Sequence, residues 1–331
     1  PEATFALFQE AVALHRGEYY NDAVAVWEKL AQQFATDKRA PEASFRAART
    51  RFEMAQYAVA IGGYEKLIQN YPQSPFAQRA FLQIGQSHFN AGDYPKAIEA
   101  YLDYKTRYAK DPEITQVDQL LSYAYYKSGM SPDEISKLTA GQAKSPVLAD
   151  IYWEEGAKAY NNKDYAKARE SFQKLLYEFP SATVAPQASF FRAESVFLQE
   201  NWADAIPAYG SFLSSYPDDP QKPLAQFHLA VSHFNLNEHD KSAEIFEAFS
   251  KNYPNHELAK SATLNAAISY ARTGDPNKTT QAYLNYASLY PDADDVGMAY
   301  IQLGQFLEKA GQETRALEAY RRVPKSRPEY P

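Results

Sequence analysis

The segment from Gly85 to Tyr108, GQSHFNAGDYPKAIEAYLDYKTRY, contains the pattern that decides the fold. Its central small residue is Ala97, and aromatic residues follow it after four, seven and eleven positions, at Tyr101, Tyr104 and Tyr108. These spacings place the three rings on one face of an α-helix. Gly85, another small residue, lies twelve positions before Ala97. The pattern therefore predicts two consecutive helices. The first passes close to another helix at its small residue, Gly85, and the second carries the aromatic residues on one face.

The pattern recurs along the whole chain. We call the central small residue of each unit its anchor. Anchors lie 37 residues apart within two sets, which are Ala23, Ala60 and Ala97, and then Ala168, Ala205, Ser242, Thr279 and Ala316. The spacing between the two sets leaves room for a ninth, degenerate unit on Glu134. Such repetition is typical of a stacked helical array, because each unit buries its apolar face only against its neighbours.

Turn residues indicate where the two helices of each unit begin and end. In most units a proline comes one position after the last aromatic residue, and proline cannot continue a helix. Between the helices we expect a residue in the left-handed conformation, which Gly and Asn tolerate best. The candidates are Gly17, Gly92, Gly129, Gly274, Gly311, Asn162, Asn201 and Asn237. Asp93, Asp164 and Asp275 are the expected N-caps of second helices.

The order of these features resembles the tetratricopeptide repeat, although each unit is three residues longer than the usual 34. The resemblance covers essentially the whole chain. It implies an all-α fold, a right-handed α-solenoid (superhelix) of nine helix pairs. Residues 71–75 (YPQSP) and 91–94 (AGDY) resemble the bacterial cell-envelope subset of the family, which includes the barrel-assembly lipoprotein BamD and the Tol–Pal-associated protein YbgF.

The unit around Glu134 departs from the pattern. Leu138 replaces the aromatic residue, and Pro146 ends the unit without the usual spacer. We therefore expect units 1–4 in residues 1–146 and units 5–9 in residues 147–331 of one continuous solenoid, with a weak joint at 131–146. A shorter but rigidly packed repeat explains the same residues equally well.

Composition restricts the partners. The chain has 331 residues, a formal net charge of −7 and 45% hydrophobic residues, with 26 Tyr and 19 Phe. This apolar content is typical of a folded protein. The acidic balance disfavours a nucleic-acid partner, whose phosphates need clustered Lys and Arg. No apolar run reaches the length of a membrane span. Because the sequence contains no cysteine, disulfides and thiol chemistry are excluded from this segment.

The two ends of the sequence bear on location and assembly. The chain begins with Pro-Glu and has no signal peptide, so we expect a piece of a longer protein. We expect a periplasmic or outer-membrane-associated location, and a cytoplasmic one stays open. The first unit carries Phe5, Leu7 and Phe8, whereas a terminal repeat normally has a polar outer face. Further chain, a partner or another copy of the chain is therefore expected to cover at least one end.

No motif indicates catalysis. His228 and His233 are five positions apart, which misses the spacing that aligns two metal ligands on one helix face. Acidic pairs such as Glu154 and Glu155 lie near helix starts, where they favour the helix dipole. The sequence has no Gly-rich phosphate loop and no nucleophile motif. We expect no enzyme activity, no cofactor and no metal site.

The resemblance implies where a partner binds, because the first helices of tetratricopeptide arrays line a concave inner surface. Its residues lie eight, eleven and fifteen positions before each anchor. The partner-binding candidates are Phe45, Arg49, Phe52, Gln86, Phe89, Tyr123, Tyr126, Trp153, Tyr160, Phe190, Glu194, Phe197, Phe227 and Phe234. Aromatic side chains suit binding because each offers a large apolar face with little entropy to lose. Core packing between the helices is the competing interpretation of the same rings.

The leading hypothesis is a non-catalytic scaffold that binds a protein or peptide in this groove, in assembly or organisation of the bacterial cell envelope. Self-assembly through the ends or the groove is a second hypothesis. A third is an enzyme or sugar-binding module that uses the groove aromatics and carboxylates. Capture of a free C-terminal carboxylate is disfavoured, because the family's clamp needs Lys fifteen and Asn eleven positions before the anchor, and neither is present.

Overall fold

The computed structural model describes residues 2–139 and 145–324 of the chain. These residues form 18 helices and no strand. The predicted all-α solenoid of helix pairs is therefore confirmed. One compact unit of the fold ends at Ile151 and a second begins at Tyr152, within helix α9 (Val147–Asn161).

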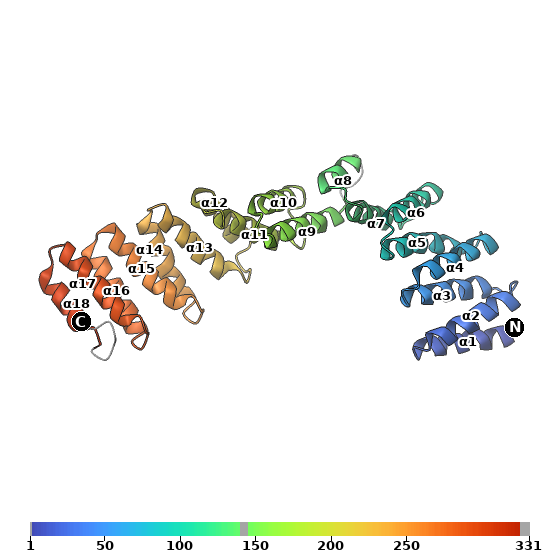
Figure 1. The fold of residues 1–331 in the computed structure, drawn as a ribbon, viewed down its shortest axis with the longest axis horizontal. Coiled ribbons are helices and arrows are strands. Elements are labelled where there is room, and N and C mark those ends of the chain that lie inside the picture. The colour runs from blue at the N-terminus through green and yellow to red at the C-terminus, as the bar shows by residue number, and fades with distance from the viewer. Residues whose placement is uncertain (1, 140–144, 325–331) are drawn as a thin grey trace. The chain divides into compact units, whose positions relative to one another are not determined.

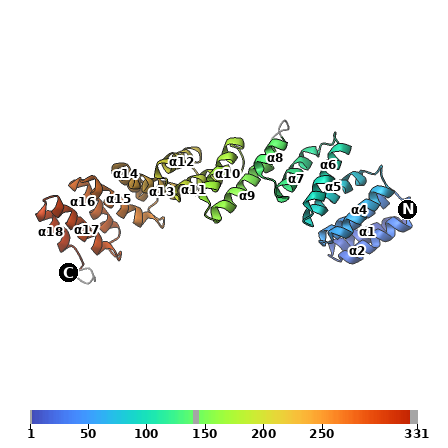
Figure 2. The ribbon, with the colours of Figure 1, turned by 45° about the horizontal axis from the view of Figure 1, so that its top comes forward.

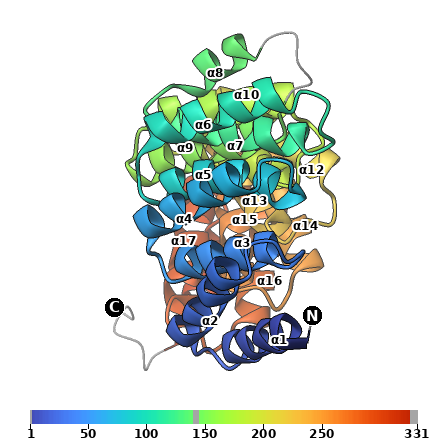
Figure 3. The same cartoon turned by 90° about the vertical axis from the view of Figure 1, so that its right-hand side faces the viewer.

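The first unit stacks its helices in chain order. In Figure 1, α1 to α7 each pack against the next helix along the chain, and Figure 3 shows the blue members of the same series from another side. The helices before α9 are α1 (Glu2–Arg16), α2 (Tyr20–Gln33), α3 (Ala40–Glu53), α4 (Tyr57–Asn70), α5 (Pro75–Asn90), α6 (Tyr94–Arg107), α7 (Ile114–Lys127) and α8 (Pro132–Leu138).

The second unit repeats this arrangement. From α10 to α18 each helix again packs against the next one, which can be followed in Figure 2. The helices are α10 (Tyr165–Glu178), α11 (Ala185–Phe197), α12 (Trp202–Ser215), α13 (Lys222–Asn235), α14 (His239–Asn252), α15 (Ala259–Thr273), α16 (Pro276–Leu289), α17 (Val296–Lys309) and α18 (Glu313–Arg321). Odd-numbered helices are the first helices of their pairs, and even-numbered helices carry the anchors.

The small residue twelve positions before the anchor makes room for an aromatic ring. A β-carbon added to Gly85 would lie 2.5 Å from Cε1 of Tyr101, which is the aromatic residue four positions after the anchor of the same pair. Gly156 meets Phe172 in the same way, also at 2.5 Å. The rings fill the space between the paired helices. The expected close approach is therefore confirmed, and the small residue is needed because an aromatic ring of the second helix of the same pair occupies the space beside it.

The ends of the second helices follow a common pattern. The aromatic residue eleven positions after the anchor is the C-cap, directly after the last helical residue, and its backbone N–H donates to the carbonyl of the residue seven positions after the anchor. At the other end, Asp93, Asp164 and Asp275 accept backbone hydrogen bonds as N-caps. The prediction of these three caps is confirmed.

The left-handed turn residue always lies five positions before the anchor. Gly92, Gly129, Gly274, Gly311 and Asn237 have positive φ as expected, but the prediction is wrong for Gly17, Asn162 and Asn201. In the units of Gly17, Asn162 and Asn201 the left-handed residue is instead Glu18, Lys163 or Glu200, respectively. In the unit around Ala60 it is Ala55. The geometry of the helix pair fixes this position, so side chains without any left-handed preference are held there.

The degenerate unit has a short second helix. Helix α8 has seven residues, and Ser131 is its N-cap. The Ser131 hydroxyl accepts a hydrogen bond from the Glu134 N–H, while the Glu134 carboxylate accepts one from the Ser131 N–H. Leu138 occupies the aromatic position but is 55% exposed, whereas Ile135 is fully buried. Residues 140–144 of the expected joint lie outside the described residues. The joint at 131–146 stays a prediction.

Candidate binding face of the first helices

The predicted partner-binding residues lie on first helices, from α3 to α13. We call the surface formed by the positions eight, eleven and fifteen residues before the anchors the first-helix face. Arg49 is exposed, whereas Phe190 and Glu194 are only 3% and 5% exposed and lie beneath this face. The others are partly buried: Phe45, Phe52, Gln86, Phe89, Tyr123, Tyr126, Trp153, Tyr160, Phe197, Phe227 and Phe234.

Apart from Tyr126, the candidate rings eight positions before the anchor each pack against the first residue of the following helix. Phe52 lies 5.5 Å from Tyr57 between ring centroids, and Phe197 lies 5.1 Å from Trp202. Phe89, Tyr160 and Phe234 make the equivalent edge-to-face contacts with Tyr94, Tyr165 and His239. One side of each ring therefore packs at the turn between the paired helices. The rest of the ring stays partly accessible.

The rings fifteen positions before the anchor contribute more to the core between paired helices. Phe45 packs on Tyr64 with 5.7 Å between ring centroids, and Trp153 packs on Phe172 with 5.4 Å between ring centroids. Phe190 and Phe227 make similar contacts with Phe212 and Phe246. Their partners are fully buried aromatic residues of second helices, so this set supports the first-helix face more than it forms its surface.

In the first unit the first-helix face carries a polar ladder. The Arg49 guanidinium lies 5.7 Å from the Phe52 ring and its Nη1 donates to Oε1 of Gln83 at 3.5 Å. The amide nitrogen of Gln83 in turn donates to Oε1 of Gln86 at 2.8 Å. Further along, Nζ of Lys127 lies over the rings of Tyr123 and Tyr126. The Arg49 guanidinium is also paired with the Glu53 carboxylate at 3.1 Å, so its charge is balanced within α3.

In the second unit a carboxylate joins three helices. Oε1 of Glu194 on α11 accepts a hydrogen bond from the Tyr209 hydroxyl of α12 at 2.5 Å and lies 2.8 Å from Nδ1 of His228 on α13. The His228 ring also stacks on Phe197 with 4.3 Å between centroids. Sequence reasoning placed Glu194 on the face but missed His228, because a contact between residues 34 positions apart has no local signal.

The protonation of nearby tyrosines follows from this environment. Burial, followed by the negative charge of Glu194, raises the pKa of Tyr209 far above its ordinary value. The phenol therefore stays protonated and keeps donating to the carboxylate. Burial also raises the pKa of Tyr160 to about 12, with Glu194 again contributing. A carboxylate in apolar surroundings needs such donors, because an unpaired buried charge is costly.

A cavity of about 260 Å³ opens beside this cluster, between α13 and α15. Val231 and Phe234 of α13 and Ile268 of α15 come from positions of the first-helix face. Phe246 of α14 completes the apolar lining, and the amides of Asn235 and Asn265 complete the polar part. The cavity can accept one apolar side chain with polar groups next to it.

Neither a membrane-spanning helix nor a metal-binding cluster occurs among the described residues. Among residues 2–139 and 145–324, no helix has both the length and the apolar character needed to cross a bilayer. Within the same residues, no three or more His, Asp or Glu side chains form a group suited to a metal ion.

Comparisons with known protein families agree with the repeat architecture. Residues 45–112 and 298–330 match tetratricopeptide-repeat families. With its pairs of helices stacked in chain order, the chain has the architecture of tetratricopeptide repeats. Residues 148–242 match the YfiO family of outer membrane lipoproteins. The protein thus resembles BamD-like members of the repeat family over this segment.

Solved structures with a similar fold include three repeat proteins. The MamA protein is 18% identical, with 53% of this chain and 89% of that chain covered and a TM-score of 0.42. The TPR2AB domain of yeast Sti1, solved in complex with pHSP90, is 15% identical, with 82% and 99% covered and a TM-score of 0.33. The TPR domain of P58(IPK) is 16% identical, with 97% and 83% covered and a TM-score of 0.32. The comparison with curated proteins found no match.

Proposed function

We propose that this protein is a non-catalytic scaffold that binds an extended protein segment on the first-helix face of its second unit. The observation that carries the proposal is the cavity of about 260 Å³ between α13 and α15. It lies at Val231, Phe234 and Ile268, which are positions that a tetratricopeptide array directs toward a bound segment. An apolar side chain of the segment fills the cavity and gains the free energy of leaving water.

The size and the polar groups of the cavity favour a peptide over a free small molecule. Small-molecule sites usually enclose about 300–1,000 Å³, which is more than this cavity offers. Asn235 and Asn265 supply amides at its border, and amides can pair with both the N–H and the C=O groups of an extended main chain. One side chain in the cavity and main-chain hydrogen bonds beside it are the usual elements of peptide recognition.

The neighbouring polar cluster adds selectivity to this site. Phe197 of α11 and His228 of α13, the helix that also lines the cavity, are partly exposed, and the buried Glu194 contacts His228. A bound segment that places an apolar residue in the cavity can also place a polar residue against His228, because both lie on α13. Polar groups held in place in this way reject segments that leave them unpaired.

We further propose that the scaffold acts in assembly or organisation of the bacterial cell envelope, in the periplasm or at the outer membrane. The support is the match of residues 148–242 to YfiO outer membrane lipoproteins. That segment includes Glu194, Phe197 and His228 of the proposed site. Fractionation of cells that produce the protein from its own gene tests the location, and recovery in the cytosol contradicts it.

The binding site is tested with random linear peptides displayed on phage. Peptides selected on the wild-type chain are expected to share an apolar residue and to lose binding to Asn235→Trp, which covers the cavity. Asn235 is the exposed last residue of α13, and Asn252 is the exposed last residue of the second helix α14, so Asn252→Trp is the matched control. Equal binding to wild type and Asn235→Trp contradicts the proposed site.

A further inference from the structure

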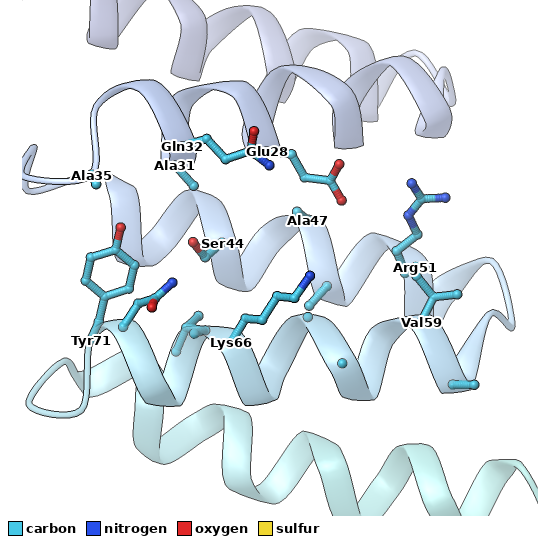
Figure 4. A pocket seen from close by; sticks show the side chains of 16 residues that line it. Glu28, Ala31, Gln32, Ala35, Ser44, Ala47, Arg51, Val59, Lys66 and Tyr71 are labelled. Atoms are coloured by element: carbon cyan, nitrogen blue, oxygen red, sulfur yellow. The ribbon is translucent and has the colours of Figure 1, made fainter.

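A second, larger cavity lies in the first unit on a different surface. It measures about 810 Å³ and forms a groove between the second helices α2 and α4, above the first helix α3 (Figure 4). Ala31 of α2 and Ala35, which follows the end of α2, lie along one wall, and Gly62 of α4 lies along the other. Ser44 and Ala47 of α3 form its floor. We call it the α2–α4 groove.

The depth of this groove comes from the small residues of its floor. The equivalent space between α4 and α6 measures about 400 Å³, and there Phe81 and Ile84 occupy the repeat positions of Ser44 and Ala47. Side chains of ordinary size therefore fill half of the groove elsewhere in the same unit. The α2–α4 groove is open because these two positions are small.

The surface of α4 has also lost the charges that its repeat positions carry in other units. The residue directly before the anchor is charged elsewhere, as in Asp22, Lys96, Asp133, Lys167, Asp204, Lys241, Lys278 and Arg315. In α4 this residue is Val59, and it is 56% exposed. Gly62 occupies a position that is Glu99 in the next unit, and a β-carbon there meets no atom within 4 Å. An apolar patch with a polar border is typical of a protein interface.

The charges around the groove favour an acidic partner. Arg51 and Lys66 enter it from α3 and α4, opposite Glu28 of α2 (Figure 4). Nε of Arg51 is buried without a hydrogen-bond partner, although Nη1 of the same side chain donates to Gln56. In the part of the chain that the structure describes, Lys66 has no ion pair. Two cationic groups against one carboxylate leave the groove with positive charge in a chain whose net charge is −7.

We propose that the α2–α4 groove binds an acidic amphipathic α-helix of another protein. Ser44, Ala47 and Arg51 lie at helical spacing along the floor, so a second helix can pack its side-chain ridges into this row. Small residues on the bound helix contact Ala47 and Gly62, where backbones can approach closely. Acidic residues along one side of the bound helix pair with Lys66 and Arg51. This surface is separate from the first-helix face of the second unit, so either site can fail without the other.

Designed peptides provide the test. The probe is a fluorescent, hydrocarbon-stapled helix with alanine on one face and glutamate along one flank, and its twin carries lysine in place of glutamate. We expect the full chain to bind the glutamate peptide at least about tenfold more tightly than the lysine peptide. Gly62→Trp and Lys66→Glu should each weaken binding by about tenfold or more, because they remove the space or the charge.

Matched variants control for general effects. Gly210 of α12 is also a helical glycine whose β-carbon would meet no atom within 4 Å, so Gly210→Trp adds the same bulk elsewhere. Lys174 occupies the repeat position of Lys66 in α10, so Lys174→Glu makes the same charge change. Both controls should bind as the wild type does, and circular dichroism should show equal helix content in all variants.

Three results would overturn the proposal. The first is equal affinity for the glutamate and lysine peptides, or no measurable binding of either. The second is unchanged binding to Gly62→Trp. The third concerns a second copy of the chain as the occupant: if light scattering finds a wild-type dimer that Gly62→Trp converts to a monomer, the groove is a self-association surface.

Discussion

The ring of Tyr101 lies 2.5 Å from the place where a β-carbon on Gly85 would be, although the two residues belong to different helices. The ring packs into the notch left by the missing side chain and is itself buried. This contact joins α5 to α6, and small-to-aromatic pairs of this type recur at Gly156 with Phe172 and at Gly304 with Tyr320. The repeat is therefore held together by a steric fit as well as by general apolar burial.

Gly85→Ala should destabilise the protein by about 1–3 kcal/mol, because the added methyl group overlaps the Tyr101 ring and forces the two helices apart. Urea denaturation measures this change. The control is Gly210→Ala, which adds the same methyl group to a helix where no atom lies within 4 Å and should raise stability by up to about 1 kcal/mol. Equal effects of the two substitutions would disprove the steric explanation.

Ala55→Gly should stabilise the first unit by up to about 1 kcal/mol, because Ala55 has φ of 58° and a side chain in the left-handed conformation is strained. Gly92→Ala, at the same repeat position, should destabilise by about 1 kcal/mol for the reverse reason. Thermal unfolding of both variants checks the pair. A loss of stability in Ala55→Gly would show that Ala55 is not strained.

Tyr209→Phe should cost about 1–3 kcal/mol, because it removes a hydrogen bond to the buried Glu194 carboxylate without supplying another donor. Tyr177→Phe is the matched control, since Tyr177 is 82% exposed and the change there should stay within about 0.5 kcal/mol. Chemical denaturation compares the two. The role of the Tyr209 hydroxyl would be refuted by equal stability of both variants.

Stability should fall at alkaline pH. Burial raises the pKa of Tyr160 and Tyr283 from the ordinary value of 10.0 to about 12, so the folded state holds these protons more tightly than the unfolded state does. Their contribution is complete below about pH 10 and is lost as the pH rises toward 12. Circular dichroism and phenolate absorbance, followed together, should show these tyrosines ionising as the helices unfold. Full ionisation of every tyrosine near pH 10 with the helices intact would contradict this expectation.

Backbone amides of α8 and its N-cap, residues 131–138, should exchange faster than those of α7 and α10. Helix α8 has only seven residues, and Leu138 is exposed where other units bury an aromatic ring, so few contacts oppose local opening. Hydrogen exchange measured by mass spectrometry tests this joint. Protection equal to that of the flanking helices would favour the alternative, a short but rigid repeat.

The repeat pattern alone determined the helix pairs and their order. The anchors and the aromatic residues after them have helical spacing, and each unit contacts its neighbours in sequence, so local periodicity was sufficient. The same reasoning located the first-helix face but could not decide how far each ring on it is exposed. Phe197, for example, packs on Trp202 of its own pair and stacks on His228 of the next pair. The exposed area of the Phe197 ring depends on both contacts.

Only the tertiary structure decided which polar and open sites exist. The contact of Glu194 with His228 spans 34 residues and crosses between two helix pairs, so its formation depends on how closely α11 and α13 pack. The α2–α4 groove likewise depends on Ser44 and Ala47 facing the same space as Gly62 of another helix. Helical spacing fixes the face on which a residue lies, whereas the volume and charge of a site are set by what the adjacent helices place beside it.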